Sequence, residues 1–216
     1  MSETMIARPS FAARPSWRRA RLGHVLTATT LVICLVLGFA LRAQWASSPS
    51  AHRSADDRAY GRIALALSSG GSYGDSEMND PYQWAPGAPA MFALARELGG
   101  GSVAPGYRIE AAYWAQALVG TLAIAVAFLL TAATAGSARG RAAAAVAGVA
   151  AACAAAFYPP LVAASGSQLS EPLGALLLLA ACAALAAART RRRAVSLALC
   201  GALLGAAVLA RADLLL

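Results

Sequence analysis

Five long apolar segments constrain the fold of this 216-residue chain more than any other feature. They cover about residues 22–41, 111–135, 142–158, 169–188 and 194–209. A helix that crosses a bilayer needs about 20 apolar residues, with a range of about 17–25. The segments therefore predict an all-α, polytopic transmembrane helical bundle with about five spans. The third and fifth segments are short and rich in alanine, which is typical of helices that pack closely among other helices.

The composition supports a membrane protein. The chain is 59% hydrophobic and only 13% charged, whereas soluble domains carry about 25% charged residues. This argues against a disordered chain, a disulfide-rich secreted scaffold and an ordinary cytosolic enzyme. The 18 basic residues are all arginine and give a net charge of +8. They cluster beside the apolar segments and not along an aromatic-rich stripe, so we expect no nucleic-acid partner.

The distribution of arginine predicts the topology. The N-terminal tail (residues 1–21) and the turns at 136–141 and 189–193 carry eleven arginines and one acid, Glu3. Five alternating spans place all three clusters on one side, which the positive-inside rule assigns to the cytoplasm. The sequence therefore predicts a cytoplasmic tail (1–21) and a transmembrane domain (22–216) whose first loop, 42–110, is extracytoplasmic. A cleaved signal peptide is the alternative for the first span, but its apolar run is long and no A-x-A site follows.

The long outer loop contains two predicted juxtamembrane helices. In the first, residues 56–67, Tyr60, Ile63, Ala64 and Leu67 follow helical spacing and form one apolar face. We expect this helix to lie along the membrane surface with that face down. The second covers residues 86–98 and is followed by three glycines, which favour a helix end.

Charged residues at the predicted outer face are the candidate site. Asp56 and Asp57 open the first loop helix, Glu171 begins the fourth span, and Arg211 ends the fifth. Each has a structural alternative. Ser54 and Asp57 fit a capping box, and Ser167 or Ser170 could cap the helix that Glu171 begins. Arg211 could extend along the helix to the interface or pair with Asp213.

The sequence indicates no cofactor. The four cysteines lie inside apolar segments without metal-ligand spacing, and the two histidines lack partners at such spacing. The acidic pair could hold a divalent cation, because hard cations prefer carboxylate oxygens.

The order of these motifs resembles the N-terminal part of GT-C-type membrane glycosyltransferases, similar to dolichyl-phosphate-mannose protein mannosyltransferases and lipid A aminoarabinose transferases. One span is followed by a long outer loop with an acidic pair and D-x-x-x-Y (Asp56 to Tyr60). A P-G-x-P segment at 86–89 follows, then Y-P-P-L at 158–161 and L-S-E-P at 169–172. The match covers about residues 22–216.

The resemblance implies an inverting transferase of the cell membrane. It would transfer a sugar from a polyprenyl phosphate in the membrane lipid to the hydroxyl of an unidentified acceptor (protein, lipid or glycan). Asp56 matches the catalytic base and Asp57 its acidic neighbour. Tyr60 and Glu171 match substrate-binding positions, and Arg211 matches the basic residue that faces the lipid phosphate.

The chain also departs from that family. Relatives often have glutamate at the Asp57 position and a basic residue before the loop prolines, where this chain has Trp84 and Ala85. They usually have eight or more spans, so the resemblance predicts a fragment or a truncated gene product. The alternatives are a non-catalytic membrane protein, such as a transporter or assembly component, and an inactive remnant.

Overall fold

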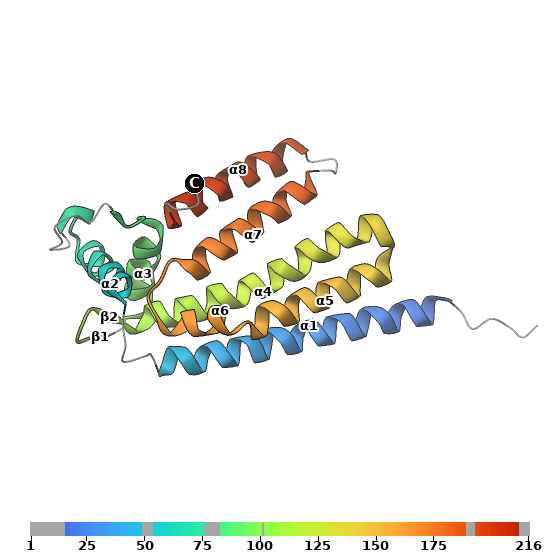
Figure 1. Cartoon of the computed structure of the whole chain (residues 1–216), viewed down its shortest axis with the longest axis horizontal. Helices are drawn as coiled ribbons and strands as arrows, with labels where there is room; N and C mark the ends of the chain where they lie inside the picture. The colour runs from blue at the N-terminus through green and yellow to red at the C-terminus, as the bar shows by residue number, and fades with distance from the viewer. Residues whose placement is uncertain (1–15, 49–53, 76–82, 101, 189–192, 212–216) are drawn as a thin grey trace, which may run out of the picture.

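The computed structural model describes residues 16–48, 54–75, 83–100, 102–188 and 193–211 and is all-α apart from one short β-hairpin (Figure 1). In chain order its elements are α1 (Ser16–Ser47), α2 (Ala55–Ser68), η1 (Tyr73–Asp75), α3 (Gly87–Gly99), β1 (Val103–Ala104), β2 (Arg108–Ile109), α4 (Glu110–Arg139), α5 (Arg141–Phe157), α6 (Pro159–Ala163), η3 (Ala164–Gly166), α7 (Glu171–Ala187) and α8 (Arg193–Ala210). The antiparallel hairpin pairs Val103 with Ile109 and was not predicted.

The helices form a bundle with a separate layer at one end. Helices α1, α4, α5, α7 and α8 run alongside one another, while α2, α3 and the hairpin gather at one end (Figure 1). The junction of α4 with α5, the C-terminal end of α7 and the N-terminal end of α8 lie at the opposite end (Figure 1). These helix ends and the layer therefore lie at opposite ends of the bundle.

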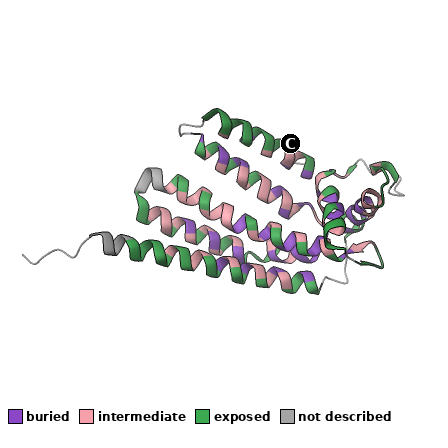
Figure 2. Ribbon diagram, turned by 180° about the vertical axis from the view of Figure 1, so that it is seen from behind, coloured by how far each residue is buried: buried purple, intermediate pink, exposed green. Residues whose placement is uncertain are grey.

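The bundle has three to four candidate membrane-spanning helices. The segments Arg21–Ser47, Glu110–Ala135 and Arg193–Ala210 are long and apolar enough to cross a membrane. The pair Arg141–Phe157 and Pro159–Gly166 qualifies as a fourth span when taken together, although it is bent by 52°. Helix α7 is apolar but has only 17 residues. Each predicted apolar segment thus lies mainly in a helix. Much of the surface of these helices is exposed (green in Figure 2), and the exposed residues include many leucines and valines.

The N-cap predicted at Ser54, at the start of α2, is confirmed. The Asp57 backbone N–H donates to Ser54 Oγ at 3.0 Å, which satisfies one of the free donors of a helix N-terminus. At the other end of the layer, α3 ends at Gly100, which adopts the left-handed conformation with φ of 58°. Glycine favours this conformation because it has no Cβ.

The apolar face of α2 packs on protein, which corrects our expectation that it lies on the membrane. Tyr60 and Ala64 form one buried cluster with Phe92 and Ala93 of α3 and with Ala112 of α4. Burying such side chains contributes about 25 cal/mol per Å² of apolar area. This contact fixes the layer to the end of α4.

Arg42 is also placed differently from our expectation. The prediction assigned it to the outer loop, but α1 continues to Ser47 and buries Arg42, which is 1% exposed. Its guanidinium donates to the carbonyls of Ala155 at 2.9 Å and Ala156 at 3.1 Å, near the end of α5. The last carbonyls of a helix lack helical partners, so Arg42 satisfies them where α5 gives way to α6.

Two buried glutamines hold the irregular stretch between α6 and α7. Gln116 of α4 donates to the carbonyls of Ser167 at 3.3 Å and Leu169 at 2.5 Å. Gln168 accepts the Ile109 N–H at 2.7 Å and donates to the Tyr107 carbonyl at 3.1 Å. Both glutamines are fully buried. They therefore fix the backbone that leads into Glu171.

Gly61 allows α2 to approach this stretch. A Cβ built on Gly61 would lie 2.3 Å from the Tyr107 carbonyl oxygen and 2.5 Å from Gln168 Nε2. Real Cβ atoms do not come this close to backbone, so the contact requires glycine.

We predict that Gln168→Leu destabilises the protein. The substitution removes the partner of the buried Ile109 N–H, at a cost of about 1–3 kcal/mol, and it also removes a hydrogen bond to the half-buried Tyr107 carbonyl. Thermal unfolding in detergent should show a clear loss of stability. Gln44→Leu, at an exposed position of α1, is the matched control and should change the unfolding free energy by less than about 0.5 kcal/mol. Equal stability of the two variants would contradict the role assigned to Gln168.

Candidate functional site

A polar cavity of about 270 Å³ opens where the layer meets the bundle. Its wall combines residues of α2, the segment before α3, the start of α7 and the end of α8: Asp56, Tyr60, Gln83, Trp84, Ala85, Leu169, Ser170, Glu171 and Arg211. A larger cavity of about 830 Å³ lies between α4, α7 and α8. That one is lined mainly by apolar side chains and by no carboxylate, so the smaller cavity is the candidate site.

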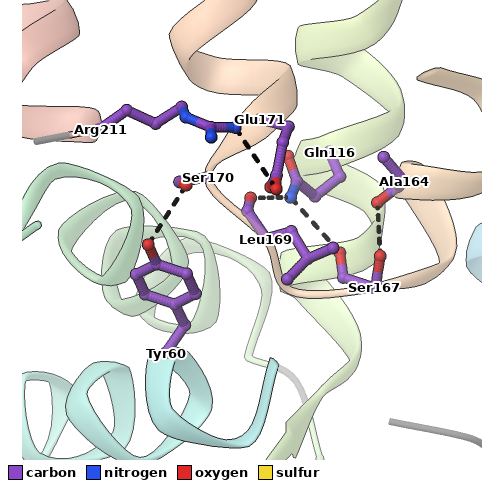
Figure 3. A network of polar contacts seen from close by, with 8 residues as sticks. All are labelled: Tyr60, Gln116, Ala164, Ser167, Leu169, Ser170, Glu171 and Arg211. Carbon is purple, nitrogen blue, oxygen red and sulfur yellow. Dashed lines mark hydrogen bonds and ion pairs between the residues drawn. The ribbon is translucent and has the colours of Figure 1, made fainter. Parts of the chain in front are cut away.

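Glu171 and Arg211 form an ion pair in this cavity (Figure 3). The Arg211 guanidinium lies 3.4 Å from Glu171 Oε1, and the two side chains are 29% and 45% exposed, respectively. The other carboxylate oxygen, Oε2, is buried and accepts no hydrogen bond within the described part of the chain. The pairing that the sequence suggested between Arg211 and Asp213 falls outside the described residues.

Ser170 bonds the tyrosine and does not cap α7 through its side chain. The Tyr60 hydroxyl donates to Ser170 Oγ at 3.2 Å, which ties α2 to the start of α7 (Figure 3). Ser167 Oγ bonds the carbonyl of Ala164. Neither serine therefore makes the cap that the sequence suggested for Glu171.

Tyr60 is a neutral hydroxyl in this site. Burial raises its pKa, and the nearby carboxylates of Glu171 and Asp56 raise it further, while the hydrogen bond with Ser170 and the charge of Arg211 act in the opposite direction. Because the phenol pKa is ordinarily about 10, a raised pKa keeps the proton on Tyr60 throughout the neutral range. Tyr60 therefore keeps the proton that it donates to Ser170.

Asp56 contributes a second carboxylate, which is exposed in the first turn of α2. The indole Nε1–H of Trp84 donates to Asp56 Oδ1 at 3.1 Å. Trp84 is held in turn by the Tyr73 hydroxyl, which donates to its carbonyl. The indole thus fixes the direction of the carboxylate.

The structure gathers most of the predicted site residues. Asp56, Tyr60, Glu171 and Arg211 line one cavity. Asp57 is 2% exposed and does not belong to the lining, so it is separated from the other four.

Sequence reasoning missed Trp84 and Ser170 as site residues. The position of Trp84, just before the P-G-x-P segment, could have indicated a site residue. We instead interpreted the absence of a basic residue there as the loss of a contact. Nothing local in the sequence marked Ser170 as the partner of a residue 110 positions earlier.

This arrangement suits a polar, anionic ligand. Two carboxylates can accept protons or hydrogen bonds from hydroxyl groups, and one guanidinium can bind a phosphate or carboxylate. Among the residues that the structure describes, no three histidine, cysteine or acidic side chains are grouped so as to hold a metal ion.

Comparisons of the chain with protein-family models, with curated proteins and with solved structures found no significant match.

Proposed function

We propose that this chain forms the acceptor-activating part of an inverting membrane glycosyltransferase that uses a sugar on a polyprenyl phosphate. One observation carries the proposal: Asp56, Glu171 and Arg211, far apart in sequence, line one cavity at the end of an apolar bundle. A base and a phosphate-binding cation beside a membrane are what transfer from a lipid-linked donor requires. The resemblance of the motif order to GT-C-type enzymes supports the same function.

In this proposal all five apolar helices of the bundle cross the cell membrane. The arginine-rich turns face the cytoplasm, and the layer with its cavity lies on the extracytoplasmic side. The end of α8, which precedes Arg211, then lies at the outer boundary of the bilayer. A phosphate on a lipid in the outer leaflet can reach Arg211 from there.

Asp56 acts as the general base. Trp84 occupies Oδ1, which leaves Oδ2 to accept the proton of an acceptor hydroxyl. The acceptor oxygen forms a bond to the anomeric carbon as the bond from that carbon to the phosphate oxygen breaks. The phosphate leaves with the electron pair, the proton goes to Asp56, and attack from the opposite face inverts the anomeric configuration.

Arg211 stabilises the leaving group. Negative charge develops on the phosphate as the glycosidic bond breaks, and a fixed cation stabilises that charge. The guanidinium already pairs with Glu171, which holds it toward the cavity before the donor arrives. The Tyr60 oxygen, whose proton goes to Ser170, and the Oε1 atom of Glu171 can accept hydrogen bonds from the hydroxyl groups of the sugar.

The first prediction of this function concerns the base. Asp56→Asn removes the proton acceptor but keeps an oxygen that can bond Trp84. We expect transfer of radiolabelled sugar from polyprenyl-phosphate donors, measured in membranes that contain the full-length protein, to fall by about 10²–10⁴-fold. Asp75→Asn is the matched control, since that exposed carboxylate bonds only the neighbouring Ser72 in the described structure. Transfer by D56N at the wild-type rate, in protein inserted normally, would remove Asp56 as the base.

The second prediction concerns the cation. Arg211→Gln should raise the KM for the donor and lower kcat, because a charge-assisted contact to phosphate is lost. We expect kcat/KM for the donor to fall by about 10–100-fold, in line with bonds to charged groups. Arg211→Lys keeps the charge without the planar guanidinium, and it should retain intermediate activity. An unchanged KM for the donor in R211Q would place the phosphate elsewhere.

A further inference from the structure

A second, smaller cavity lies beside the site. It has a volume of about 180 Å³ and is lined by Ala55, Arg58, Ala59, Arg62 and Trp84. Trp84 belongs to the linings of both cavities. The indole that bonds the Asp56 carboxylate is therefore also a wall of this second space.

Two arginines supply the charge of the second cavity. Arg58 and Arg62 lie four residues apart on α2 and so share one face of the helix. The alanines Ala55 and Ala59 on the same face leave room between the helix and Trp84. Neither arginine forms an ion pair with a carboxylate within the described part of the chain. Like charges at this spacing destabilise a helix slightly, and no carboxylate of the described residues offsets this pair by an ion pair.

Arg62 packs against Tyr107, a residue whose backbone is strained. Its guanidinium carbon lies 4.6 Å from the centroid of the Tyr107 ring, and its Nε is buried without a hydrogen-bond partner among the described residues. Tyr107 itself has a φ of 63°, a left-handed conformation that no other non-glycine residue of the described structure adopts. Such strain persists only where surrounding contacts impose it. The fold therefore holds Arg62 in place before any ligand binds.

We propose that Arg58, Arg62 and Trp84 form a subsite for an anionic group, a phosphate or a carboxylate, carried by the acceptor. Guanidinium groups match the geometry of these anions and can bind them through paired hydrogen bonds. An anion held here lies across Trp84 from the first cavity, so a hydroxyl of the same molecule can reach Asp56. The assignment to the acceptor rests on the proposed transferase function, whereas the binding of an anion does not.

The location favours the acceptor over the lipid-linked donor. The lining consists of residues from α2 and of Trp84, and no residue of the apolar helices contributes to it. The donor phosphate is instead assigned to Arg211, at the end of α8. In this assignment the first cavity binds an anion at the end of the bundle, and the second cavity binds another anion in the layer.

The first experiment measures anion binding alone. Inorganic phosphate is titrated against chloride at constant ionic strength, with full-length protein in phosphatidylcholine nanodiscs, and tryptophan fluorescence is recorded. The titration uses the Arg211→Gln background, which removes the donor site. We expect saturable binding that weakens about ten-fold or more when Arg58→Gln and Arg62→Gln are added. The matched control, Arg108→Gln, removes an arginine near the hairpin and should leave the affinity unchanged.

Other outcomes overturn the subsite or its assignment. Equal affinity with and without the two substitutions removes the subsite. Arg58→Gln alone, at an exposed position, keeps this test valid should the double variant unfold. Loss of phosphate binding when the nanodiscs contain phosphatidylglycerol would identify a lipid headgroup as the ligand and overturn the assignment to the acceptor.

The second experiment separates the subsite from the proposed function. In the transfer assay, R58Q/R62Q should raise the KM for the acceptor about ten-fold or more and leave the KM for the donor unchanged. A raised donor KM instead would assign the pair to the donor. If the protein binds phosphate through Arg58 and Arg62 but transfers no sugar, the subsite stands and the transferase function falls.

Discussion

The satisfaction of backbone polar groups in an apolar bundle is the constraint on which the site depends. Irregular backbone at membrane depth is tolerated only where other protein groups bond it. The stretch between α5 and α7 holds only the short α6 and η3 and interrupts the regular helical hydrogen bonding. Buried Arg42, Gln116 and Gln168 bond its carbonyls or its neighbours. This same stretch ends at Ser170 and Glu171. The interactions that make the break tolerable therefore also set the position of the acidic wall of the cavity.

The charges of the site also match the ends of the helices that carry them. Asp56 lies in the first turn of α2, and Glu171 is the first residue of α7. Arg211 follows α8 directly, and its backbone N–H still bonds the carbonyl of Ala207. Carboxylates are favoured at helix N-termini and cations at C-termini, typically by about 0.3–1 kcal/mol each. Three helix ends thus converge on one cavity, and each presents the charge that its own dipole stabilises.

Features set by local sequence could be predicted, while those set by distant contacts could not. The apolar helices and the N-cap at Ser54 depend on neighbouring residues, and both appear as predicted. Arg42 looked like a loop residue because a charge usually ends an apolar segment. Its burial depends on carbonyls of Ala155 and Ala156, more than 110 positions away. Likewise, the sequence could nominate Asp56 and Arg211, but the role of Trp84 depends on packing that no local pattern records.

The proposed reaction centre lies at a junction between two bodies, so its geometry depends on how closely they approach. The proposed base, Asp56, belongs to the layer, and Arg211, the cation proposed to bind phosphate, follows α8 of the bundle. Two glycines, Gly61 and Gly87, allow the layer and the bundle to approach each other closely. A Cβ on Gly61 would lie 2.5 Å from Gln168 Nε2, and a Cβ on Gly87 would lie 2.9 Å from the Leu209 carbonyl of α8. The Leu209 atom is backbone, and the Gln168 side chain is fully buried and held by two hydrogen bonds, so neither can easily move aside. A side chain at either position would push the layer from the bundle and separate Asp56 from Arg211 without altering either residue.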